Sequence, residues 1–296
     1  MDLLNSYQRA RLLLVSAAVL CYCVFWWTGR FLDIPAHQGF AASLLQQPVA
    51  AVVLLIIAVV FVLCVALGTA VAGVVRFNAG LAAAGIGLMA LSVRGGSSRY
   101  VLFHAVSEGA GTAVFLKLMI ETALLGIIIG GCAMLLEWLY SSGTLRDRES
   151  AIPPPVADRS DASAFALQLI VTAVAVALIA RTEDKQQVLA AVGIGSFAGT
   201  AIAQSVFPTD QRGWYWAAPL LVGLIGYLLA YLNPSGMSHG HLINAFAPLA
   251  RPLPLDYASL GVAGAVLGHW MGRRWHRERE DAATTRPLPE SARLPS

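Results

Sequence analysis

The chain has 296 residues, of which 57% are hydrophobic and only 12% are charged, and its formal net charge is +3. Because a soluble domain carries about 25% charged residues to keep its surface wetted, this composition excludes an ordinary soluble protein and predicts one embedded in lipid. Much of the positive charge lies in the C-terminal tail beside an apolar segment, which favours contact with anionic lipid over a nucleic-acid partner. The four cysteines all lie in apolar runs and predict no disulfide framework.

Eight apolar segments follow one another along the chain. A helix needs about 20 mostly apolar residues to cross roughly 30 Å of hydrocarbon. The segments cover residues 12–28, 48–75, 79–93, 112–140, 164–180, 188–207, 214–232 and 257–272. Three of them, the third, fifth and eighth, are short, so the expected number of spans is eight, plus or minus one. The predicted fold is an all-α, polytopic transmembrane helical bundle.

A polar stretch at residues 141–163 divides the apolar segments into two groups of four. It contains Pro153-Pro154-Pro155 among charged residues, which is typical of an extended linker. We therefore expect a first membrane half at 1–140, a linker at 141–163 and a second membrane half at 164–272. A basic, disordered tail is expected at 273–296.

The basic residues of the short loops set the expected orientation. They are more numerous on the side that holds both termini, so the positive-inside rule predicts cytoplasmic N- and C-termini in a cell membrane. The loops on the other side, residues 30–47, 94–111 and 233–256, are too apolar for simple solvated linkers. We expect them to form short interfacial or re-entrant helices that cover the outer side of the bundle.

Glycines spaced four residues apart predict close helix packing. Such spacing stacks them on one helix face, where a neighbouring backbone can approach. The candidates are Gly126, Gly130, Gly195, Gly199, Gly264, Gly268 and Gly272. We expect these faces to pack within the molecule, with a homo-oligomer interface as the alternative. The lone amides Gln168 and Gln204 of the fifth and sixth segments, and His269 of the eighth, are expected to form contacts between helices.

Two ionisable residues stand four apart in the fourth apolar segment. Lys117 and Glu121 share a helix face and are expected to form an ion pair. An ionisable group within a span suggests a proton relay or transport role, because a lone charge there is costly. The alternative is structural, since Lys117 is near the helix end and its amine can reach outward to the interface.

Four histidines fall on the predicted outer side. They are His37, His104, His239 and His241, and acidic residues share two of their loops. Imidazole with carboxylate suits a transition metal or zinc, and the alternative is a set of interfacial histidines with no ligand role. The sequence identifies no particular cofactor.

Three functional classes remain open. The first is a small-solute or ion transporter, or the membrane subunit of a transport complex. The second is a non-catalytic assembly subunit of a larger membrane complex, and the third is a membrane-embedded metal-dependent enzyme using the outer histidines. The near-total membrane embedding and the predicted ion pair favour transport, whereas the small number of polar residues within the segments favours an assembly subunit. The expected partners are the lipid bilayer and other membrane subunits or a second copy of the chain, with no nucleic acid.

Overall fold

The computed structural model describes residues 6–31, 43–46, 49–73, 78–98, 101, 112–142, 160–207, 214–233 and 247–284. Within these ranges the regular structure is entirely helical. The longer helices are α1 (Ser6–Phe31), α2 (Ala50–Ala72), α3 (Ala79–Arg94), α5 (Ala113–Ser141), α6 (Ser160–Ile179), α7 (Lys185–Val206), α8 (Ala217–Leu232) and α10 (Val262–Thr284). They match the eight predicted segments in order, and the all-α bundle is confirmed.

Five of these helices are long and apolar enough to cross a membrane: α1, α2, α5, α6 and α7. The helices α3 and α8 have 16 residues each, which gives about 24 Å and falls short of the hydrocarbon thickness. The eighth predicted segment differs most. It starts as a π-helical turn, η5 (Tyr257–Gly261), and α10 then continues to Thr284, so residues 273–284 of the expected disordered tail are helical.

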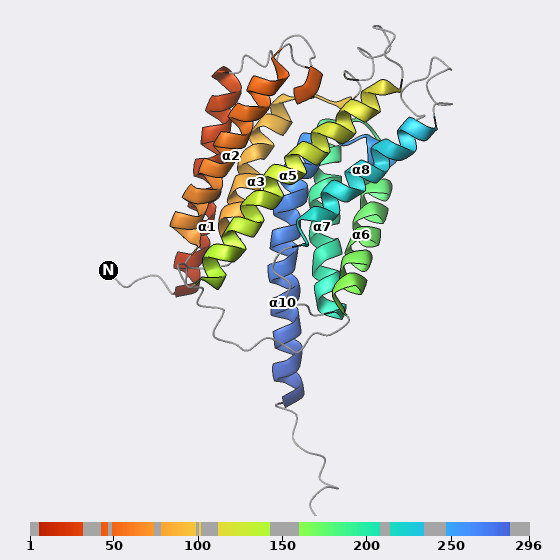
Figure 1. The fold of residues 1–296 in the computed structure, drawn as a ribbon. Coiled ribbons are helices and arrows are strands. Elements are labelled where there is room, and N and C mark those ends of the chain that lie inside the picture. The colour runs from red at the N-terminus through yellow and green to blue at the C-terminus, as the bar shows by residue number, and fades with distance from the viewer. Residues whose placement is uncertain are drawn as a thin grey trace, which may run out of the picture.

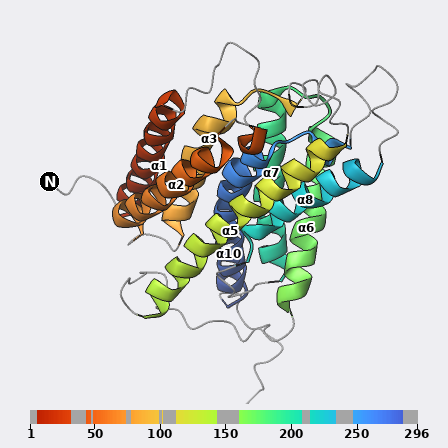
Figure 2. The ribbon, with the colours of Figure 1, turned by 45° about the horizontal axis from the view of Figure 1, so that its top comes forward.

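The helices form one bundle with α10 near its centre (Figures 1 and 2). The helices α1, α2 and α3 pack together on one side, and α6 and α7 pack together on the other. Between these groups, α10 packs against both α3 and α7, while α5 crosses obliquely and packs mainly on α8. The two expected halves therefore share large interfaces, and their division at residues 141–163 stays a prediction.

The helix α1 begins and the helix α10 ends at the same end of the bundle (Figure 1). We call this the terminal end; it holds the start of α1, and the last turns of α10 extend beyond the other helices there. At the opposite end lie three short helices, η1 (Leu44–Gln46), η4 (Pro248–Ala250) and α9 (Pro254–Asp256). Short outer helices were expected, but Leu44, Leu253 and Leu255 are each 1% exposed. These helices are therefore packed into the bundle at this end.

The predicted packing glycines lie at contacts between helices. A Cβ atom added to Gly264 would be 2.5 Å from the Gly193 carbonyl oxygen, and one added to Gly272 would be 2.7 Å from Gln204 Cβ. Gly268 faces the backbone of Phe197 even more closely. The backbones of α7 and α10 thus lie directly against each other. Of the others, Gly195 and Gly199 face α6, and Gly126 and Gly130 face α8.

Candidate functional site

The most irregular backbone in the described chain is the segment 247–261, which we call the broken segment. Its three prolines, Pro248, Pro252 and Pro254, lack backbone N–H donors, so a continuous helix is not possible there. The chain forms η4, turns extended at Leu253, forms the single turn α9 and enters the π-helical turn η5. Most of its residues are buried. Irregular backbone at membrane depth is tolerated only where protein buries it or where it lines a cavity.

Two tyrosine side chains, one from α8 and one from the broken segment itself, donate to carbonyl groups of the broken segment. The Tyr227 hydroxyl, from α8, donates to the Pro252 carbonyl, and the Tyr257 hydroxyl donates to the Leu249 carbonyl at 2.7 Å. The two tyrosine rings meet edge to face with centroids 6.4 Å apart. These contacts hold the non-helical backbone in one conformation.

Asp256 is the centre of a buried polar network. Its Oδ1 accepts hydrogen bonds from Lys185 Nζ at 2.5 Å and from the Ser92 hydroxyl, and its Oδ2 accepts from the Leu253 N–H at 2.8 Å. The side chains of Lys185 and Asp256 are 14% and 1% exposed. The network thus connects the broken segment to the start of α7 and the end of α3. A buried carboxylate needs such compensation, because its desolvation costs several kcal/mol.

Arg251 brings a second cation into the same region. It is 8% exposed, and its Nη1 donates to the Ala180 carbonyl at 2.6 Å, directly after α6. Its Nε has no hydrogen-bond partner among the described residues. Arg251 and Lys185 therefore connect the broken segment to the two ends of the α6–α7 connection.

Glu121 is a second buried carboxylate, and its surroundings differ from those expected. It is fully buried in α5, where its Oε2 accepts from the Ser43 hydroxyl at 2.9 Å and from the Leu45 N–H at 3.4 Å. Lys117 is exposed, and no ion pair joins it to Glu121 in the described chain. The physical reason is that Ser43 and η1 supply uncharged hydrogen-bond donors at the buried face of α5. The Glu121 carboxylate points to these donors, while the Lys117 amine stays at the exposed periphery of the bundle.

The Oε1 atom of Glu121 has no hydrogen-bond partner among the described residues. Its helix, α5, packs against both α9 and η5. The end of the bundle opposite the termini therefore contains two buried carboxylates, Glu121 and Asp256, on elements in direct contact. With Lys185 and Arg251, they form what we call the polar core.

The predicted histidine site falls where the structure gives no description. His37, His104, His239 and His241 all lie outside the described residues. Within the described ranges, no group of three or more His, Cys, Asp or Glu side chains is placed to hold a metal ion. The metal site stays a prediction.

Sequence reasoning missed most of the polar core. It identified Glu121 but not Asp256, Lys185 or Arg251, because Asp256 and Arg251 were assigned to an outer loop and Lys185 to a polar bend. A usable signal was present in the run from Arg251 to Asp256, where two charges and two prolines alternate with apolar residues. A solvated loop has no need of such apolar residues.

Comparison with protein-family models, curated proteins and solved structures gives no match. The class of this protein is therefore inferred from its own sequence and structure. Five long apolar helices, with many large apolar side chains exposed on their outer faces, indicate a helical membrane protein in contact with a lipid bilayer.

Proposed function

We propose that this chain transports an ion or a small polar solute, alone or as the membrane subunit of a transport complex, and that the polar core is its site. The observation that carries the proposal is the buried broken segment with its Asp256–Lys185 pair. Transport proteins build binding sites from discontinuous helices, whose free backbone groups and charges face the solute. A π-helical turn beside Asp256 adds to this, since such turns occur often at functional sites.

The chemistry of the polar core suits a charged solute or a proton. Asp256 is neutralised by a lysine that a cation can replace, and Glu121 has one oxygen free to accept a proton or hydrogen bond. During transport, the Asp256 carboxylate exchanges the Lys185 ammonium group for a cation from solution, so it is paired with a positive charge in both states. Such a pair needs no net change of buried charge during transport, which keeps the desolvation cost low.

Proton flux into proteoliposomes tests the proposal. The vesicles contain a pH-sensitive dye, and a potassium-diffusion potential is applied across their membrane. The initial rate of acidification is compared with that of vesicles without protein. The measurement is then repeated with Na⁺, K⁺ or Cl⁻ as the other ion in the solution. We expect the wild-type chain to exceed empty vesicles and Asp256→Asn to lose most of the excess. Arg274→Gln, at an exposed position 54% accessible, is the matched control and should retain it.

Wild-type vesicles that match empty vesicles for protons and for all three other ions would contradict the transport of an ion. That result would favour the second candidate, a structural or assembly subunit. One observation supports this candidate: Asp256 connects α3, α7 and the broken segment through its hydrogen bonds, as expected of a group that fastens helices together. The third candidate, a metal-dependent enzyme, rests on the four outer histidines and is tested by metal analysis of the purified protein.

A further inference from the structure

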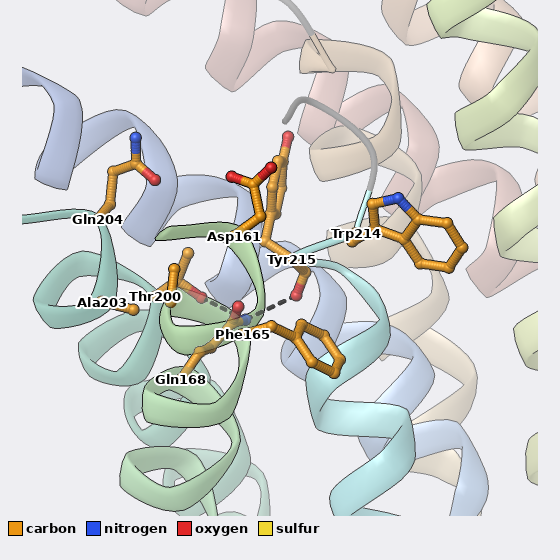
Figure 3. Close-up of a pocket in the computed structure, with 9 residues that line it drawn as sticks. Asp161, Phe165, Gln168, Thr200, Ala203, Gln204, Trp214 and Tyr215 are labelled. Atoms are coloured by element: carbon orange, nitrogen blue, oxygen red, sulfur yellow. Dashed lines mark hydrogen bonds between the residues drawn. The ribbon is translucent and has the colours of Figure 1, made fainter. Parts of the chain in front are cut away.

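A pocket with a mixed polar and apolar lining lies between α6, α7 and residues 214–215, which precede α8, away from the polar core (Figure 3). Its empty volume is about 360 Å³, which includes space open to the outside. The polar residues that line it are Asp161, Gln168, Thr200, Gln204 and Tyr215. Ala164, Phe165, Ala203 and Trp214 complete the wall. Polar linings of this kind are expensive inside a membrane protein and mark water-accessible sites.

The amide of Gln168 is fixed in one orientation by its partners. Its Nε2 donates to the Thr200 hydroxyl at 2.8 Å and to the Tyr215 carbonyl at 2.7 Å (Figure 3). A carbonyl can only accept, and the Thr200 hydroxyl already donates its proton to the Ser196 carbonyl. The nitrogen must therefore face both groups. Among the described residues, the only hydrogen bonds of the Gln168 amide are the two from its nitrogen, so its oxygen is an open acceptor there, on a pocket-lining residue that is 3% exposed.

Asp161 places a carboxylate two helical turns from Gln168, on the same helix. The rise of seven residues is about 10 Å, so the two groups lie at different depths and do not bind one ion together. Asp161 stands in the first turn of α6, at the mouth of the pocket, and its buried Oδ1 has no hydrogen-bond partner among the residues that the structure describes. The pocket thus has a negative group at its mouth and a free acceptor at its floor.

Polar groups continue beyond the floor. Ser196, one turn deeper on α7 than Thr200, is fully buried, and its hydroxyl has no hydrogen-bond partner in the described chain. On the side of α10, the Tyr215 ring stacks on His269 with centroids 4.4 Å apart, and Asn78 donates to the Tyr215 hydroxyl at 2.7 Å. The wall is therefore held by hydrogen bonds and stacking, as expected of a preformed cavity.

We propose that this pocket is a water-filled vestibule that opens at the terminal end, admits small cations and disfavours anions. Asp161 attracts cations at the mouth, and the Gln168 oxygen accepts hydrogen bonds or coordinates a cation at the floor. The vestibule is a property separate from the transport role, because it determines only which solutes enter the bundle from solution at the terminal end.

Cysteine accessibility tests the vestibule. In a background with Cys21, Cys23, Cys64 and Cys132 replaced by alanine, Ala164→Cys adds a thiol to the pocket wall. Ala166→Cys is the matched control: the same residue type, two positions along α6, on its exposed outer face. Cationic and anionic methanethiosulfonates of similar size are added from each side of membrane vesicles, and modification is followed by mass spectrometry.

We expect Ala164→Cys to react from the terminal side only, and Ala166→Cys to stay unreactive because lipid covers it. The rate of modification by the cationic reagent is divided by the rate for the anionic reagent, and this ratio is compared with the ratio for a free thiol. It should be higher on the order of tenfold, because the single negative charge of Asp161 lies a few ångströms away. Asp161→Asn should lower this preference several-fold. A thiol at position 164 that reacts no faster than one at 166 means a sealed pocket, and an unchanged preference in Asp161→Asn means no selection for cations; either result overturns the proposal. Neither outcome depends on whether the chain transports anything.

Discussion

At the scale of single residues, burial decides what the ionisable groups of α5 do. Lys117 and Glu121 are one turn apart, yet one is exposed and the other fully enclosed. The difference follows from where hydrogen-bond donors are available. Glu121 finds the Ser43 hydroxyl and the Leu45 N–H inside the bundle, whereas the lysine stem is long enough to carry its amine outward.

This arrangement predicts which substitutions are coupled. In a double-mutant cycle of thermal unfolding in detergent, Lys117→Met and Glu121→Met should be additive within about 0.5 kcal/mol, because the side chains share no partner. The cycle of Ser43→Ala with Glu121→Met should show a coupling of about 0.5–3 kcal/mol. A coupling above about 1 kcal/mol in the first cycle would restore the ion pair predicted from the sequence.

At the scale of helices, the contact between α7 and α10 depends on residues without side chains. Gly264, Gly268 and Gly272 stand four apart and bring the α10 backbone against α7. In lipid there is little hydrophobic drive between helices, so close backbone packing supplies much of the attraction. The single turn α9 and the turn η5 then set the direction in which α10 leaves the broken segment.

Two glycine substitutions separate packing from helix propensity. Gly268→Ala places a methyl group against the Phe197 backbone, and overpacking of this kind costs about 1–3 kcal/mol. Gly131→Ala, on an exposed face of α5 with nothing within 4 Å, should be neutral or slightly stabilising, since alanine favours helix over glycine. Thermal unfolding of both variants in the same detergent is the measurement. Equal melting temperatures would contradict the close α7–α10 contact.

The helices were far easier to predict from the sequence than the polar core. Apolar runs predict spans because lipid demands them, and α3 and α5 begin and end within a residue or two of the expected limits. The polar core could not be predicted in the same way. Asp256, Lys185 and Ser92 are far apart in sequence, and only the tertiary packing of α3, α7 and the broken segment brings them together.

At the scale of the whole molecule, the bundle has two chemically different ends. The polar core lies at one end, and the start of α1, the arginine-bearing residues 273–279 of α10 and the Asp161 pocket lie at the other. This polarity is compatible with the positive-inside prediction, which places the terminal end in the cytoplasm. The polar core would then face the outer side of the cell membrane.

Reporter fusions check this orientation. A reporter inserted at Gly143 and one placed after Arg279 should both indicate the cytoplasm, because basic residues gather on that side. An insertion in the connection between α6 and α7, at Thr182, should indicate the outer side and is the control for reporter activity. A cytoplasmic signal at Thr182 together with an outer signal at Gly143 would reverse the molecule in the membrane.

The most direct test of the account is flux through a chain whose central pair has been replaced without leaving a lone charge. Breaking a buried pair by one substitution costs about 3–5 kcal/mol, whereas replacing both partners by apolar side chains is often nearly neutral. Asp256 also accepts hydrogen bonds from the Ser92 hydroxyl and the Leu253 N–H, so the variant to test is Lys185→Met, Asp256→Asn, whose amide oxygen is still an acceptor, and it should unfold close to the wild-type temperature. Its proteoliposomes should nevertheless acidify no faster than empty vesicles. A stable double variant with wild-type flux would contradict the account and reduce the Asp256–Lys185 pair to a structural contact.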